Sequence, residues 1–238
     1  MRILDVIVPS TCTLCGGWVC GGTGGVCRSC AGTMPRIEEP VCDICGNELI
    51  GTRGRCMRCR ELHPDGGDAE EPTLRCRGVF VYNETVAAAM ARFKAHGDIR
   101  LAKWVARELD ALCTRQWPEA VVIPIPGSPR NVRRRGWDHM EEVTRELGRR
   151  GVATGRLLRR VDGPEQKALS REARRSAVTR SLVLRRSPRS SRPGRCGAPR
   201  RIVLIDDVRT TGATLEAAAA LLRDGGHLVA GAAILAIR

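Results

Sequence analysis

The chain has 238 residues, of which 42% are hydrophobic and only 3% aromatic, and its formal net charge is +14. This length suits one domain of ordinary size and a smaller one, with a core built from aliphatic side chains. Because aromatic residues are so scarce, the composition excludes a protein that binds nucleic acid mainly by stacking bases on aromatic rings.

The positive charge is concentrated in the middle of the chain. Residues 120–201 contain 22 Lys and Arg but only 7 Asp and Glu. A localised positive field favours polyanionic partners: phosphorylated small molecules, nucleic acid or an anionic surface. A compositional origin is the alternative, because 37 of the 40 basic residues are Arg, as a GC-rich genome would produce.

The sequence contains no recognisable membrane or export segment. No stretch approaches the roughly 20 apolar residues of a membrane helix. The first ten residues, MRILDVIVPS, are too few for a signal peptide and are interrupted by Asp5. We therefore expect a cytoplasmic protein, in which twelve cysteines need a role other than disulfide formation.

Four C-x2-C pairs lie in the first sixty residues. Each pair presents two thiolates to one metal ion, and two pairs complete a tetrahedral site with four cysteine ligands. The pattern predicts two closed, structural zinc sites, with the metal supplying the folding energy of a region that has little apolar material. A redox dithiol is the alternative, but it would not need four copies. The predicted ligands are Cys12, Cys15, Cys27, Cys30, Cys42, Cys45, Cys56 and Cys59.

The pairing of these knuckles stays open at this point. Consecutive knuckles are the simplest arrangement, with the first four cysteines in one site and the last four in the other, but an interleaved arrangement is possible. We expect a double zinc-ribbon domain over residues 1–65, followed by a polar, acidic linker at 61–73. The remaining cysteines are expected to be free thiols, and His63 a surface residue; these cysteines are Cys20, Cys76, Cys113 and Cys196.

Strands and helices alternate over residues 74–238, which predicts an α/β domain with a doubly wound parallel sheet. Apolar periodicity indicates amphipathic helices, the second of which carries Leu101, Val105, Leu109 and Leu112 on one face. We expect strands at 78–83, 200–206 and 227–238, one within 119–128 that runs into a Pro/Gly loop, and short ones at 156–161 and 181–184. Helices are expected at 84–95, 98–113, 137–149 and after residue 214, and polar loops at 162–180 and 185–199.

Two adjacent acids, Asp206 and Asp207, lie at the end of the strand predicted at 200–206. Ligands of such sheets bind beyond the carboxyl ends of the strands. The following loop leads into a helix, whose free N–H groups and dipole favour a phosphate. The acids are acceptors suited to sugar hydroxyls, so the two features together describe a ribose 5-phosphate site. We expect both acids to lie at the rim of the sheet and to contribute little to the core.

The stretch IVLIDDVRTTGAT, residues 202–214, resembles the phosphoribosyl pyrophosphate (PRPP) signature of type I phosphoribosyltransferases. The resemblance implies that Asp206 and Asp207 contact the ribose hydroxyls. Arg209 stands where the general signature has an apolar residue. The loop implied to surround the 5-phosphate consists of Arg209, Thr210, Thr211, Gly212, Ala213 and Thr214.

The whole chain resembles the ComF family of competence-related proteins. Zinc knuckles, RFKAHGD, VIPIPGSPRNVRRRGWDH, EQKALSREARR and the PRPP loop follow one another in that family's order. The resemblance implies a phosphoribosyltransferase-like domain over residues 74–238 that binds PRPP or a related phosphoribosyl compound with Mg²⁺. It also implies single-stranded DNA and the DNA-uptake machinery as partners. Asp138 and His139 replace the amide pair of the usual RGFNQ stretch.

The resemblance also assigns the groups that handle pyrophosphate. It implies a pyrophosphate loop at Pro126, Gly127 and Ser128, supported by Arg130 and Arg135. Residues 165–175 would form a flexible loop that closes over the site and excludes water. The polar candidates on that loop are Gln166, Ser170, Arg171 and Arg174; the last two are predicted, with Asp206 and Asp207, to act in catalysis.

Three functions are consistent with these features. The first is a phosphoribosyltransferase, an enzyme of the glycosyltransferase type, whose acceptor the sequence does not specify. The second is a non-catalytic module that handles single-stranded nucleic acid, and the third is a regulator that senses PRPP. Little sequence follows the last strand, so we expect any cover for an acceptor to come from the zinc ribbons or from residues 74–97, with Lys94 and His96 as groups that could face the site.

Overall fold

The computed structural model describes residues 11–19, 25–62, 74–96, 98–161, 181–185 and 201–238. Its main sheet has four parallel strands in the order β1 (Cys76–Val81), β6 (Leu228–Ile237), β5 (Arg201–Arg209) and β2 (Val121–Pro124). The last strand in sequence thus lies inside the sheet, between β1 and β5. Its Ala- and Ile-rich sequence suits that position, because a strand covered on both faces has no polar side to turn toward water.

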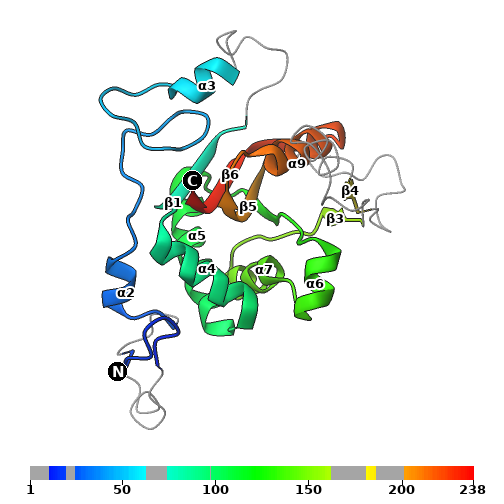
Figure 1. Ribbon diagram of the computed structural model, residues 1–238. Helices are drawn as coiled ribbons and strands as arrows, with labels where there is room; N and C mark the ends of the chain where they lie inside the picture. The colour runs from blue at the N-terminus through cyan, green and yellow to red at the C-terminus, as the bar shows by residue number, and fades with distance from the viewer. Residues whose placement is uncertain (1–10, 20–24, 63–73, 97, 162–180, 186–200) are drawn as a thin grey trace, which may run out of the picture.

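Helices cover both faces of the sheet (Figure 1). Three of them, α4 (Glu84–His96), α5 (Ile99–Gln116) and α7 (His139–Arg149), pack on one face, and α9 (Ala213–Asp224) packs on the other. Strand β5 contributes side chains to the core on both faces of the sheet. Val203 and Ile205 belong to the core cluster under the three helices, and Ile202 and Leu204 belong to the cluster under α9. The alternation follows from the period of two along a strand.

Local capping explains where the site helices begin. Asp98 accepts a hydrogen bond from the Arg100 N–H at the start of α5, and Asp138 accepts one from the Met140 N–H at the start of α7. Helix α9 begins instead after Gly212, which has a φ of 84° and so favours a residue without a Cβ.

Two features differ from the sequence-based expectation. Residues Pro129–Arg135 form a short helix, α6, where only a Pro/Gly loop was expected. Three arginines fill its last turn and it has no apolar stripe, so periodicity could not reveal it. The short strands β3 (Leu158–Arg160) and β4 (Leu182–Leu184) pair antiparallel in a separate two-stranded sheet.

Both Cys-rich segments dock on the sheet domain, and they lie at opposite ends of the molecule (Figure 1). The first contains α2 (Arg28–Gly32) and is held by Asp98, which accepts a hydrogen bond from Thr13 at 2.9 Å. The second contains α3 (Met57–Leu62) and is held by β1, where the Cys76 N–H donates to the Ile44 carbonyl at 2.7 Å. None of the helices in the described ranges is long and apolar enough to cross a membrane.

Candidate functional site

A cavity of about 580 Å³ lies at the carboxyl ends of β2 and β5. This is the edge of the sheet where ligands of parallel α/β domains bind. Its walls come from α4, the loop after β2, α6, the starts of α7 and α9, and the ends of β3 and β5. The lining residues that carry most of its chemistry are Lys94, Gly127, Arg135, His139, Arg160 and Asp206.

The two acids at the end of β5 are not equivalent. Asp206 is partly exposed in the cavity, whereas Asp207 is buried with 6% of its surface exposed. The prediction that both acids lie at the rim of the sheet is therefore wrong for Asp207. The reason is tertiary, because helices α4 and α7 pack over this face of β5 and cover that carboxylate.

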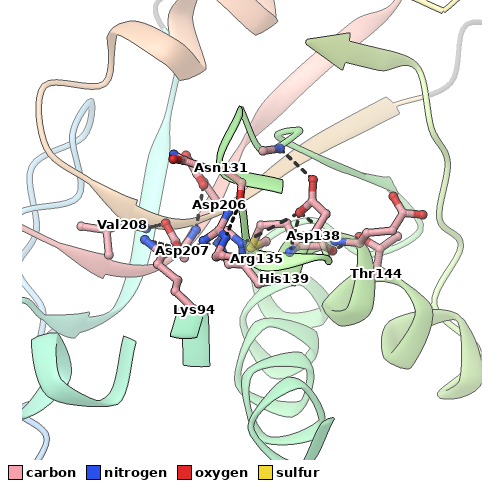
Figure 2. A network of polar contacts seen from close by, with 12 residues as sticks. Lys94, Asn131, Arg135, Asp138, His139, Thr144, Asp206, Asp207 and Val208 are labelled. Atoms are coloured by element: carbon pink, nitrogen blue, oxygen red, sulfur yellow. Dashed lines mark hydrogen bonds and ion pairs between the residues drawn. The ribbon is translucent and has the colours of Figure 1, made fainter. Parts of the chain in front are cut away.

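Asp207 connects these two helices to the sheet (Figure 2). Its Oδ2 lies 2.5 Å from Lys94 Nζ on α4 and 2.7 Å from His139 Nε2 on α7. Its Oδ1 accepts a hydrogen bond from the Val208 N–H at 2.7 Å. Both oxygens are thus engaged within the protein. The sequence comparison treated His139 only as a departure from an amide, but the structure shows it as a partner of the acid pair.

The two acids also differ in the pKa of their carboxyl groups. Burial raises the pKa of Asp206 to about 8, and the negative charge of Asp207 acts in the same direction. Burial also raises the pKa of Asp207, but the hydrogen bond with His139 and the charge of Lys94 outweigh it and bring that pKa to about 2. Asp207 is therefore ionised at neutral pH. Asp206 is poised to lose a proton when a ligand supplies hydrogen-bond donors or positive charge.

We expect the free energy of unfolding to fall as the pH rises from about 4 to about 8, in a way that depends on Asp206. Its folded-state pKa, about 8, exceeds the ordinary 3.8, so the folded protein holds a proton that the unfolded chain has released. The stabilisation is complete below pH 4 and is lost as pH approaches 8, with a slope of up to about 1.4 kcal/mol per pH unit. Urea denaturation at pH 5 and pH 8 measures the loss. An Asp206→Asn variant that keeps the full pH dependence of the parent would contradict this assignment.

The loop after β2 is tied to α7 by Asp138. The Gly127 N–H donates to Asp138 Oδ2 at 2.9 Å, while Oδ1 of the same residue caps α7. A Cβ on Gly127 would lie 2.9 Å from that Oδ2, so the contact requires a glycine. Asp138 therefore gives the loop from Pro126 to Ser128, which lines the cavity, a fixed position relative to α7.

The structure brings together only part of the predicted site. Pro126, Gly127, Ser128, Arg135, Asp206, Asp207 and Thr214 line the cavity. The predicted loop residues Arg209, Thr211 and Ala213 line a second cavity, and Thr210 is exposed at the turn. Gln166, Ser170, Arg171 and Arg174 lie outside the described residues, together with His63, Cys20 and Cys196. Arg130 does not line the main cavity.

Sequence reasoning missed three polar residues that line the cavity, namely Asn131, Arg134 and Arg160. The first two lie on α6, which carried no periodic pattern. Arg160 ends the short strand β3 and donates to the Ser181 hydroxyl at 3.1 Å. Its position beside Asp206 depends on β3 lying across the end of the main sheet, and no local pattern predicts that.

The eight knuckle cysteines form two clusters suited to a metal ion. The sulfur atoms of Cys12, Cys15, Cys27 and Cys30 lie within 4.8 Å of one another, and so do those of Cys42, Cys45, Cys56 and Cys59. Consecutive knuckles therefore share a site. Four sulfur ligands at these separations fit a closed tetrahedral zinc site.

In each cluster the protein environment favours the thiolate of one cysteine, whereas burial raises the pKa of others, namely Cys30, Cys45 and Cys59. Burial raises the pKa of Cys42, but backbone N–H groups, including that of Cys56 at 3.3 Å, outweigh it and lower the pKa to about 6. Cys12 receives the equivalent N–H from Cys27, and its pKa falls to about 6 against the same effect of burial. The two ribbons thus repeat one local geometry, in which backbone N–H groups stabilise the thiolate of Cys12 in one cluster and of Cys42 in the other.

Comparisons with known proteins agree with this architecture. A family model described as a double zinc ribbon domain matches residues 3–60. Competence protein ComFC of Streptococcus pneumoniae is 27% identical over 201 residues, covering 84% of this chain and 82% of that protein. ComFC of Bacillus subtilis is 25% identical over 216 residues, with 90% and 84% covered. Competence protein F of Haemophilus influenzae is 29% identical over 210 residues, with 83% and 85% covered.

The chain is thus similar to ComF-type competence proteins over most of its length. The predicted fold class is confirmed, since a parallel α/β domain follows a Cys-rich double ribbon with two groups of four cysteines. A crystal structure of a hypoxanthine phosphoribosyltransferase from Staphylococcus aureus is also similar to part of this chain. It has 15% identity and a TM-score of 0.30, with 57% of this chain and 61% of that one covered.

Proposed function

We propose that this protein binds PRPP, or a closely related phosphoribosyl compound, in the cavity at the end of β5, within a domain of residues 74–238 that follows a zinc-ribbon domain of residues 1–65. The observation that carries the proposal is the juxtaposition of three features at one edge of the sheet. They are the partly exposed carboxylate of Asp206, the turn at Gly212 that opens α9, and the basic helix α6.

Asp206 is suited to the ribose hydroxyls. Its Oδ1 accepts the Asp207 N–H at 2.9 Å, which orients the carboxylate and leaves the other oxygen toward the cavity. Adjacent ribose hydroxyls are two close donors, which a carboxylate accepts better than water does because the bond is charge-assisted. Helix α9 would receive the 5-phosphate at its first turn, where backbone N–H groups have no intrahelical acceptor.

The pyrophosphate would lie between the Pro126–Ser128 loop and α6. Arg134 and Arg135 both line this part of the cavity, and their guanidinium groups match phosphate oxygens. Mg²⁺ that enters with the diphosphate would neutralise part of its negative charge beside the Pro126–Ser128 loop and α6.

A transfer reaction at this site would break the bond between ribose C1 and the pyrophosphate oxygen, which leaves with the electron pair. An acceptor atom forms the new bond to C1. The donors around the pyrophosphate would stabilise the charge that develops on the leaving group. Lys94 and His139 hold Asp207 beside Asp206, so the acid pair keeps one ionised member throughout.

Calorimetric titration of the zinc-loaded protein with PRPP and Mg²⁺ tests the proposal. We expect a saturable isotherm with one site per chain and a release of protons as Asp206 ionises. The proton release appears as a dependence of the heat on the ionisation enthalpy of the buffer. Ribose without phosphate, added at the same concentration, is the control and should give no binding. The absence of any heat or thermal stabilisation with PRPP would reject this function.

Single-stranded DNA is a second candidate, favoured by four arginines on α6, at positions 130, 133, 134 and 135. These side chains stand at the mouth of the cavity or beside it. With few aromatic residues available for stacking, we expect the affinity to come from phosphate contacts and to be independent of sequence.

Raising the salt concentration fourfold is expected to weaken that DNA binding by roughly fiftyfold, if about four phosphates are contacted. Fluorescence anisotropy with a labelled oligonucleotide measures the slope of affinity against salt. Arg134→Ala should reduce the slope by about 0.7, the value expected for one lost contact to a single strand. Binding that persists at high salt would contradict the electrostatic account.

A further inference from the structure

Arg209, which replaces an apolar residue of the general signature, turns away from the main cavity and supports the turn that opens α9. Its guanidinium packs against Gly212, since a Cβ built there would lie 2.9 Å from Nη2 and 3.1 Å from Nε of Arg209. Any displacement of this guanidinium therefore changes the packing of the turn at Gly212. The Arg209 Nε is buried and has no hydrogen-bond partner among the described residues.

A second cavity, of about 220 Å³, separates this turn from the second zinc ribbon, residues 41–62. Thr211, Ala213 and Glu216 line it from the side of α9, next to Arg209. Cys45, Asn47 and Cys59 line it from the side of the ribbon. Two metal-ligand cysteines thus face the outer side of the loop that the proposed function assigns to the 5-phosphate.

The ribbon is joined to the same region through β1. The Cys76 N–H donates to the Ile44 carbonyl at 2.7 Å, and Arg77 Nη1 donates to the carbonyls of Cys42 and Asp43 at 3.4 and 3.3 Å. Cys76 is buried beside Arg209; burial raises the pKa of its thiol to about 11, and the Arg209 charge opposes the rise. A continuous set of contacts therefore runs from the knuckle through Cys76 and Arg209 to Gly212.

The charges favour the same arrangement. A site in which four thiolates surround one Zn²⁺ ion is negative overall, because the ion carries only two positive charges. Arg209 carries its positive charge on the opposite wall of a small cavity, with Glu216 nearby and Arg58 on the ribbon side. The guanidinium of Arg209 lies between Gly212, the Cys76 side chain and the cavity that the ribbon lines, so its position depends on the ribbon staying folded.

We propose that the second zinc ribbon is a supporting part of the 5-phosphate loop, and that Arg209 is the positioning residue that transmits its state to the turn at Gly212. The inference rests on the proposed function, since it concerns the affinity of that same loop. The first ribbon, which contacts the opposite end of the molecule through Asp98, does not share this role.

The test compares two probes and matched variants by calorimetry. Ribose 5-phosphate reports on the loop, and inorganic pyrophosphate with Mg²⁺ reports on the opposite end of the cavity. Cys59→Ser alters the second ribbon, and Cys15→Ser alters the first. We expect Cys59→Ser to weaken ribose 5-phosphate binding by about tenfold, the scale of one lost hydrogen bond. It should leave pyrophosphate binding unchanged, and Cys15→Ser should change neither.

Arg209→Leu keeps the inference testable even if Cys59→Ser fails to fold. It should retain both zinc ions by elemental analysis and yet lose ribose 5-phosphate affinity by a similar factor. Arg209→Lys should recover part of the loss, and hydrogen exchange at residues 210–214 should be faster in the Leu variant. Unchanged ribose 5-phosphate affinity in Arg209→Leu, or equal losses for both probes, would overturn the inference. A parent protein that binds neither probe would instead reject the proposed function and the inference with it.

Discussion

Asp206→Asn is expected to weaken ribose 5-phosphate binding by about 10- to 150-fold while leaving the folded protein at least as stable as before. Hydrogen bonds that involve a charged group contribute about 1.5–3 kcal/mol each, and Asn keeps only part of the acceptor capacity. The stability follows from the raised pKa of Asp206, because the folded protein already favours the neutral form that Asn resembles. Calorimetry gives the affinity, and urea denaturation at pH 7 gives the stability.

Asp207→Asn is the matched control one residue along the chain. It is expected to lower the free energy of unfolding by about 1.5–3 kcal/mol, because His139 and Lys94 would lose a charged partner in a buried position. The order of stabilities is the decisive observation. If Asp206→Asn destabilises the protein and Asp207→Asn does not, the division of roles between the two acids is wrong.

The sequence identifies Asp206 and Asp207 as a pair, but it does not show that the two acids have different roles. Both residues follow the same apolar run, so their local pattern is identical. The difference arises from Lys94 and His139, which reach Asp207 from helices far away in the chain. His139 occupies a position where the family usually has an amide, and only its distance to Asp207 shows that the substitution provides a donor to the buried acid.

Elements with a strong hydrophobic period were predictable, and polar or short ones were not. Helix α5 buries Leu101, Val105, Leu109 and Leu112 as the spacing predicts, because one apolar face is sufficient to place a long helix on a sheet. Helix α6 has no such face. The position of β6 inside the sheet also escaped prediction, since an apolar strand is compatible with any interior place in the strand order.

The ligands of the metal sites could be predicted from the cysteine pairs alone, because a C-x2-C knuckle is a local feature of the sequence. Their pairing required the structure, which groups the sulfur atoms of consecutive knuckles. The role of Arg209 also could not be predicted from the sequence alone. Its sequence position marks an anomaly in the signature, and only the packing against Gly212 and the second cavity explain what the side chain does.

Removal of zinc is expected to unfold both ribbons and to leave the parallel sheet folded. The apolar cluster of the second ribbon consists of Cys42, Ile44, Cys45 and Cys59, with Leu49 and Cys56 at its edge, so most of it is metal ligand. Ile50, Met57 and Leu62 are exposed and add little burial. Zinc binding to such sites contributes about 10–16 kcal/mol at neutral pH, far more than this cluster supplies. The sheet has its own core on both faces and does not depend on that energy.

Elemental analysis of protein purified without chelator should find two zinc ions per chain, and Cys42→Ser should retain one. Limited proteolysis in a strong chelator should cut within residues 11–62 and spare the sheet, because the ribbon backbone becomes accessible once its metal-linked turns open. Circular dichroism before and after chelation should show most of the helical signal retained, since α4, α5, α7 and α9 belong to the sheet domain. Protein without zinc, or a ribbon region that resists the protease in chelator, would show that something other than the metal holds these turns together.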